Sequence, residues 1–317
     1  MQSRALERSR NLRIDWRQYL VYVGFIALFL FFAITLRDSG FTTTNNLLNI
    51  ARQTAIIATM AVAMTFVIAA GQIDLSVGAI AGLASVTTAL TIARFGPVAG
   101  VAAGLLTGLL VGAVNGLLVT RLLMPSFLVT LGMMGVARGS AMWITDTAPV
   151  PILNERYNAI FGSGSIGPVP SLLIWIIVVT AIGAVVLRKT TYGRQVLATG
   201  GNERAARFTG VDTRRIGFLV LTVSGVVAAL AGMLYAGRLQ SGRFQWGEGD
   251  ELSVIAAVVL GGTSLFGGSG SVVGSVLGAL LIGVVNNGLI LMGLESSQQI
   301  IIRGGIIIVA VALASRK

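Results

Sequence analysis

The 317-residue chain contains no cysteine and no histidine. Without cysteine it has no disulfide bonds, no thiolate chemistry and no cysteine-based metal site. Without histidine it lacks the usual metal ligand and the usual proton shuttle near neutral pH. Its two lysines, Lys189 and Lys317, do not follow a glycine, so the Gly-x-x-x-x-Gly-Lys-Ser/Thr loop that binds nucleotide phosphates is absent. If the chain takes part in ATP-driven work, a separate chain must hydrolyse the ATP.

Charged residues are also scarce, at 11% of the chain, about half the fraction that is usual in soluble domains. Hydrophobic residues make up 55%, and the mean hydropathy is +0.86. Apolar runs of about 20 residues recur, each long enough to cross ~30 Å of hydrocarbon as a helix. We therefore predict an all-α polytopic membrane protein with about ten transmembrane helices and no cleavable signal peptide. The net charge of +11 lies at the ends of these runs, so topology and membrane lipid headgroups explain it better than nucleic acid does.

The apolar runs also predict how the chain threads through the membrane. Residues 1–17 carry five arginines against two acids and should form a cytoplasmic N-terminal arm. Residues 18–317 should form one transmembrane domain, with crossings near 18–36, 50–70, 79–92, 98–119, 127–144, 171–187, 216–236, 251–265, 271–292 and 298–314. Ten crossings return the C-terminus, with Arg316 and Lys317, to the cytoplasm.

A basic segment at residues 188–215 separates two apolar runs and carries seven cations against Glu203 and Asp212. Its excess of Arg and Lys predicts a cytoplasmic loop. Within it, a short helix should begin after Asn202 as its cap and stop at Gly210. A short, protruding, basic helix favours docking of a soluble partner. The alternative is a solvated loop that only follows the positive-inside rule.

The sequence contains an internal duplication, which we assign to a first repeat at about 50–145 and a second at about 216–314. Three matches occur in the same order: residues 74–83 with 251–260, 109–118 with 280–289, and 137–139 with 302–304. The register separates equivalent helices by an odd number of crossings, so the two repeats should be inverted in the membrane. Inverted repeats with interrupted helices are typical of transporters.

Several polar residues lie in apolar surroundings, where they are costly in lipid and should face the protein interior, water or another charge. Asp74 suits the N-cap of the helix that follows it, which we favour over direct substrate contact. We expect Asn115 and Asn286 to form hydrogen bonds between helices rather than to contact the transported molecule. The candidates for a translocation path or a structural polar core are Asp74, Ser76, Asn115, Arg138, Asn286 and Arg303.

Four stretches resemble motifs of ribose-type permeases, the membrane subunits of bacterial sugar ABC importers. They are residues 71–78 (GQIDLSVG), 127–133 (FLVTLGM, followed by Arg138 and Gly139), 200–211 (GGNERAARFTGV) and 258–268 (VVLGGTSLFGG). The resemblance extends from about residue 41 to residue 314. One departure is Gln72, which stands where the family usually has glycine, and this leaves open how closely backbones approach there.

The resemblance implies a permease of the bacterial inner membrane that works as a pair, with two ATPase subunits below and a periplasmic sugar-binding protein above. ATP would bind to the partner subunits, and the permease itself would hold no cofactor and no metal. The short basic helix would be the coupling helix, seated in a cleft of the ATPase. Glu203 would pair with a basic partner residue, and small side chains would allow close approach. The docking candidates are Asn202, Glu203, Ala205, Ala206 and Gly210.

Three other functions stay open at this point. A branched-chain amino acid ABC permease shares the late glycine-rich region, although residues 73–78 favour sugar. A stand-alone secondary transporter would couple uptake to an ion gradient, but Asp74 is the sole acid available between Asp38 and Asp146. A purely anchoring membrane subunit would not need an inverted repeat.

Overall fold

The computed structural model describes residues 16–315, without the side chains of residues 16–22, 296, 303, 307 and 309–315. The N-terminal arm predicted at residues 1–17 therefore lies almost entirely outside the described part. The helices are α1 (Trp16–Thr35), α2 (Thr44–Ala69), α3 (Val77–Phe95), α4 (Pro97–Arg121), α5 (Ser126–Thr145), α6 (Glu155–Asn158), the π-helical turn η1 (Ala159–Ser163), α7 (Ser171–Lys189), α8 (Thr191–Gly201), α9 (Glu203–Phe208), α10 (Thr213–Leu239), α11 (Asp250–Leu260), α12 (Val272–Leu291) and α13 (Ser296–Ser315).

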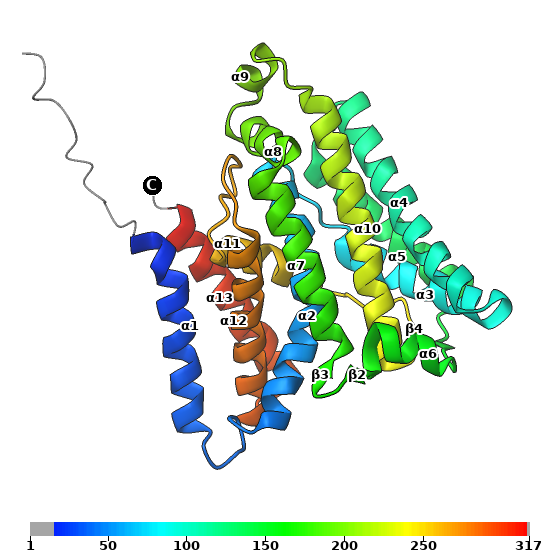
Figure 1. Cartoon of the computed structure of the whole chain (residues 1–317), viewed down its shortest axis with the longest axis vertical. Helices are drawn as coiled ribbons and strands as arrows, with labels where there is room; N and C mark the ends of the chain where they lie inside the picture. Colours follow the sequence, from blue (N-terminus) through cyan, green and yellow to red (C-terminus); the bar gives the residue numbers. More distant parts are fainter. Residues whose placement is uncertain (1–15, 316–317) are drawn as a thin grey trace, which may run out of the picture.

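The long helices form a bundle (Figure 1). Among residues 16–315, strands are confined to four two-residue pieces. β1 (Val150–Pro151) pairs antiparallel with β4 (Ser241–Gly242), and β2 (Ser165–Ile166) pairs antiparallel with β3 (Val169–Pro170). In the described part of the chain, seven helices are long and apolar enough to cross a membrane: α2, α3, α4, α5, α7, α10 and α12. The prediction of an all-α polytopic membrane protein is confirmed at this level.

The predicted crossing at 251–265 differs from the structure, because α11 ends at Leu260 after 11 residues. Such a helix is ~16 Å long, about half of the hydrocarbon thickness. Gly261 and Gly262 follow it, and Gly262 has a φ of +86°, a conformation that glycine adopts without steric cost. The apolar run in the sequence continues past these glycines, so hydropathy alone placed the end of the helix too late.

Glycines allow the central helices to pack at backbone contact. α10 packs against α2, α3 and α4. A Cβ on Gly108 of α4 would lie 2.2 Å from the carbonyl oxygen of Gly225 in α10, so any larger residue would force the two helices apart. α12 approaches α11 in the same way, since a Cβ on Gly278 would lie 2.1 Å from the carbonyl oxygen of Ala257. Small residues therefore determine how closely these central helices approach one another.

The two ends of the bundle differ in what they carry. α8 and α9 project from one end, where α1 begins and α13 ends (Figure 1). The opposite end carries α6 and the short strands (Figure 1). The basic segment and the two chain ends of the helical bundle thus lie on the same side.

Candidate functional site

The short helix α9 is built by its own sequence. Asn202 is its N-cap, and the Oδ1 atom of that side chain accepts a hydrogen bond from the backbone N–H of Ala205 at 3.0 Å. At the other end, Gly210 has a φ of +87°, and the N–H of Val211 donates to the carbonyl of Ala206 at 3.0 Å. A left-handed glycine with this backward hydrogen bond is a standard helix stop. Both the cap and the stop lie where the sequence predicts them.

The outward surface of α9 is formed by an aromatic ring and cations. Phe208 is 92% exposed, and Arg204 and Ala205 are exposed as well. Ala206 is buried at 4% exposure, so its side chain faces the rest of the permease. The prediction that Ala206 lies on the docking surface is therefore wrong. Glu203 forms an ion pair with Arg207 four residues later and also accepts a hydrogen bond from the hydroxyl of Thr213 at 3.1 Å.

α8 connects α9 firmly to the bundle. A Cβ on Gly200 would lie 1.9 Å from the carbonyl oxygen of Ala69 at the end of α2, and that oxygen also accepts a hydrogen bond from the N–H of Gly268 at 3.0 Å. The ring of Tyr192 stacks on Phe66 of α2 with centroids 6.3 Å apart. Burial raises the pKa of Tyr192 to about 12, so its hydroxyl is neutral at physiological pH. α8 therefore contacts both the end of α2 and the loop between α11 and α12.

A polar centre lies at the start of α3. The Asp74 carboxylate is fully buried and accepts three hydrogen bonds, from the backbone N–H of Ser76 at 2.9 Å, from the hydroxyl of Ser76 at 2.6 Å and from the hydroxyl of Ser224 at 2.7 Å. Asn115 of α4 donates to the hydroxyl of Ser76 at 2.9 Å. Ser76 is the N-cap position of α3, so Asp74 binds the helix start from two residues upstream rather than as the cap itself. The structure joins Asp74, Ser76 and Asn115 in one network between helices.

The remaining predicted residues do not join this network. The side-chain amide oxygen (Oδ1) of Asn286 is buried without a hydrogen-bond partner among the described residues. Its neighbour Asn287 instead forms a reciprocal amide pair with Asn46 of α2, with both N···O distances at 2.9 Å. The side chain of Arg303 lies outside the described residues. The sequence offers no signal that distinguishes the two adjacent asparagines, because both lie in the same apolar run.

Arg138 of α5 forms an ion pair with Glu248, with 3.0 Å between Nη1 and Oε1. Glu248 belongs to the segment 240–249 that connects α10 to α11. This segment folds back along α3, where a Cβ on Gly78 would lie 2.1 Å from the carbonyl oxygen of Gly247 and a Cβ on Gly82 would lie 2.6 Å from that of Phe244. The segment has no periodicity, so its path along α3 could not be predicted from the sequence.

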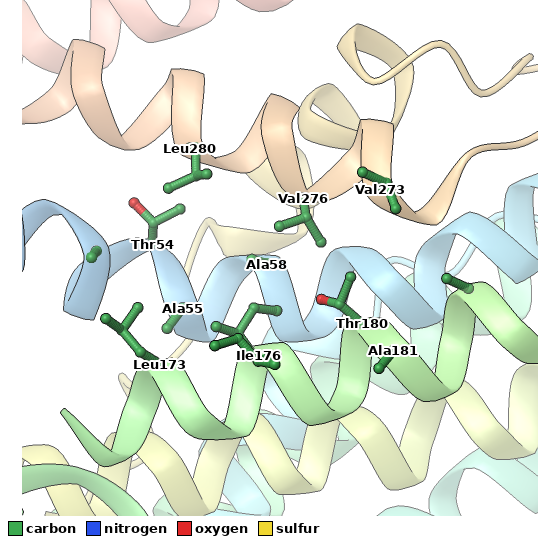
Figure 2. Close-up of a pocket in the computed structure, with 13 residues that line it drawn as sticks. Thr54, Ala55, Ala58, Leu173, Ile176, Thr180, Ala181, Val273, Val276 and Leu280 are labelled. Atoms are coloured by element: carbon green, nitrogen blue, oxygen red, sulfur yellow. The ribbon is translucent and has the colours of Figure 1, made fainter. Parts of the chain in front are cut away.

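An apolar groove of about 410 Å³ lies between α2, α7 and α12 (Figure 2). Thr54 and Thr180 are the two residues with hydroxyl groups in its lining. The other lining residues are Ala51, Ala55, Ala58, Leu173, Ile176, Ile177, Ala181, Ala184, Val273, Val276 and Leu280. Two hydroxyls are too few for a ligand with many polar groups, so the groove suits hydrocarbon rather than a sugar.

Comparison with known proteins identifies the family. Residues 46–311 match the family model described as a branched-chain amino acid transport system / permease component. The chain belongs to this permease family. The permease is 42% identical over 296 residues to the ribose import permease protein RbsC of Bacillus subtilis, covering 92% of each chain. It is 40% identical over 299 residues to the L-arabinose transport system permease protein AraH of Escherichia coli, covering 93% of this chain and 90% of that one.

The probable ABC transporter permease protein YphD of Escherichia coli is a further relative, 42% identical over 284 residues and covering 89% of this permease and 85% of YphD. No solved structure matches the permease significantly. The relatives are permease components of ABC transporters, so the permease is a transport subunit rather than an enzyme, and ATP hydrolysis belongs to a separate chain.

Proposed function

We propose that this permease is the membrane subunit of an ABC importer of the bacterial inner membrane and carries a monosaccharide delivered by a periplasmic binding protein. The observation that carries the proposal is the identity of 40–42% with the ribose and arabinose permeases over more than nine-tenths of the chain. The description of the family model mentions branched-chain amino acids, but RbsC and AraH, which match over more than nine-tenths of this chain, are named for sugars.

The ATPase subunit docks on α9, in this proposal, through the exposed surface formed by Phe208, Arg204 and Ala205. Interface anchors are enriched in aromatic residues and arginine, and Phe208 is exposed to 92% without a partner protein. Asn202 and Gly210 contribute by fixing the two ends of α9. Glu203 pairs with Arg207 within the chain and is still 56% exposed, so its pairing with a basic residue of the ATPase stays a prediction.

The proposed topology places both termini in the cytoplasm. Its support is that α1 begins and α13 ends on the side of α8 and α9 (Figure 1), where the cations of residues 188–215 gather. The count of ten crossings also fits the short α11, if the irregular segment 240–249 covers the outer half of that crossing and α11 the inner half. An irregular segment at membrane depth is tolerated where protein surrounds it.

The packing of the helices supports two inverted repeats. Exchanging α2 with α10, α3 with α11, α4 with α12 and α5 with α13 reproduces the helix contacts: α4 packs on α10 as α12 packs on α2, and α3 packs on α4 and α5 as α11 packs on α12 and α13. In the register of the sequence duplication, Gly112 corresponds to Gly283. Gly112 lies against Gly225 of α10, and Gly283 lies against Thr54 of α2. The coupling loop at 188–215 separates the two repeats.

In the mechanism we propose, closure of the ATPase subunits moves α9, and α8 passes the movement to the end of α2 and to the loop between α11 and α12. The two repeats then change from an outward-facing to an inward-facing arrangement. The Asp74 network keeps the start of α3 attached to α4 and α10 during this movement. The importer contains a second copy of the permease, and membrane lipid covers the leucine and isoleucine faces of α4 and α7.

The proposed function is tested by purifying the permease with its candidate ATPase and binding protein in lipid nanodiscs. ATP hydrolysis should rise when the binding protein is added with its sugar bound, and should rise less with the empty binding protein. Uptake of sugar by the permease alone, driven by a proton or sodium gradient, would instead establish a secondary transporter.

A further inference from the structure

The Arg138–Glu248 ion pair lies near the middle of the bundle and is nevertheless open to its surroundings. Arg138 lies close to the midpoint of α5 (Ser126–Thr145). Glu248 follows Gly247, which touches Gly78 of α3. Gly78 lies four residues after Asp74, and Asp74 accepts a hydrogen bond from Ser224 near the middle of α10. The side chains of Arg138 and Glu248 are 26% and 56% exposed. Two charged groups are thus accessible at mid-depth in a membrane protein.

Three glycines with open space around them lie on the same helix as Arg138. A Cβ on Gly132, Gly135 or Gly139 of α5 would meet nothing within 4 Å, and their spacing places all three on one face of the helix. The open face of α4 is different, because it exposes Leu106, Leu110 and Val114. Large apolar side chains of this kind suit contact with lipid. α5 also exposes Leu128 and Val136, but its three glycines leave open space beside Arg138.

Lipid is a poor environment for this face. A charged side chain at the centre of a bilayer is costly, and such residues almost always face the bundle interior or a water-filled cavity. The exposed atoms of Arg138 and Glu248 therefore require water or polar groups on the open side of α5. In the assembled importer, a second copy of the permease can keep lipid away from this side.

Unpaired polar atoms are also present beside the ion pair. Arg138 Nε and Glu251 Oε2 are buried and have no hydrogen-bond partner among the described residues. Glu251 interacts electrostatically with both Arg138 and Glu248, so one guanidinium and two carboxylates share this place. Buried polar atoms are almost always satisfied by protein or water. Here a bound molecule with several hydroxyl groups can supply both the donors and the acceptors.

We propose that Arg138, Glu248 and Glu251 form a binding site for the hydroxyl groups of the transported sugar, on the wall of a water-filled passage lined by Gly132, Gly135 and Gly139. This site rests on the proposed import function. The guanidinium donates hydrogen bonds to sugar oxygens, and the carboxylates accept them from sugar hydroxyls. The site carries two negative charges against one positive charge, so it selects a neutral sugar and disfavours a sugar phosphate.

The first test asks whether the α5 face is wet. The chain has no cysteine, so Gly135→Cys and the matched control Leu110→Cys each introduce a single thiol, both near the middle of their helices. In the assembled importer in lipid nanodiscs, a charged, water-soluble thiosulfonate should modify the Gly135→Cys thiol at least about tenfold faster than the Leu110→Cys thiol, because only a solvated thiol ionises and reacts. Gly139→Cys is the second probe of the same face. Equally slow modification at all three positions would overturn the proposal.

The second test asks whether the charges contact sugar. Glu248→Gln and Glu251→Gln should each lower uptake of ribose or arabinose per ATP hydrolysed by about tenfold, the effect of losing one hydrogen bond to a charged group. Unchanged uptake in both variants overturns the site. If the unmutated importer does not respond to its loaded binding protein, the import function itself is refuted. The modification rates of Gly135→Cys and Leu110→Cys do not depend on that response, so the two failures can be told apart.

Discussion

Replacing Phe208 by alanine gives a sharp prediction about the docking surface, because this ring is exposed to 92% in the permease by itself. Its removal leaves no cavity, so the free energy of unfolding of the permease should change by less than ~0.5 kcal/mol. In the assembled importer the ring is expected to be buried, and truncating such an aromatic anchor costs ~2 kcal/mol or more. A loss of ~2 kcal/mol corresponds to about 30-fold weaker association.

The measurement is a titration of the ATPase subunit against the permease in lipid nanodiscs, read by binding and by ATP hydrolysis. Phe95→Ala is the matched control, since Phe95 ends α3 and is 74% exposed but lies outside α8 and α9. We expect weaker association and weaker coupling for Phe208→Ala alone. Equal affinities for the two variants and the unmutated permease would refute α9 as the docking element.

Three further predictions concern the bundle itself. Asp74→Ala leaves three buried donors without their acceptor and should lower the free energy of unfolding by ~3 kcal/mol, measured by thermal unfolding in detergent. Gly108→Ala should destabilise the bundle by ~1–3 kcal/mol through overpacking, whereas Gly132→Ala, which meets open space, should leave the same unfolding midpoint unchanged. Asn287→Ala should cost ~0.6–1.7 kcal/mol, as is typical for a hydrogen bond between membrane helices; in a double-mutant cycle with Asn46→Ala, additive effects of the two substitutions would contradict the amide pair.

Features that depend on neighbouring residues could be predicted from the sequence. α9 is the clearest example, because its cap at Asn202 and its stop at Gly210 are properties of a few adjacent residues. The interior position of Asp74 also followed, since a lone acid between apolar runs must be shielded from lipid. Its partner Ser224 could not be found, because 150 positions separate the two residues in the chain.

Features that depend on distant contacts could not be predicted. The segment 240–249 reads as an ordinary outer loop, and its path along α3 depends on two glycines, Gly78 and Gly82, that admit its backbone. The predicted length of the helix at 251–265 was wrong for a related reason, because hydropathy does not reveal the backbone turn at Gly262. The ion pair between Arg138 and Glu248 depends on the path of segment 240–249. Arg138 could therefore be named as a candidate from the sequence, whereas its partner Glu248 could not.

The most direct test of the account is sugar uptake into proteoliposomes that contain the permease, its ATPase and its loaded binding protein. Labelled ribose or arabinose should accumulate when ATP is supplied on the side of α9, and Phe208→Ala should abolish most of this uptake. Accumulation without the ATPase subunit, driven by an ion gradient alone, would contradict the claim that the permease is moved by a separate ATPase through α9.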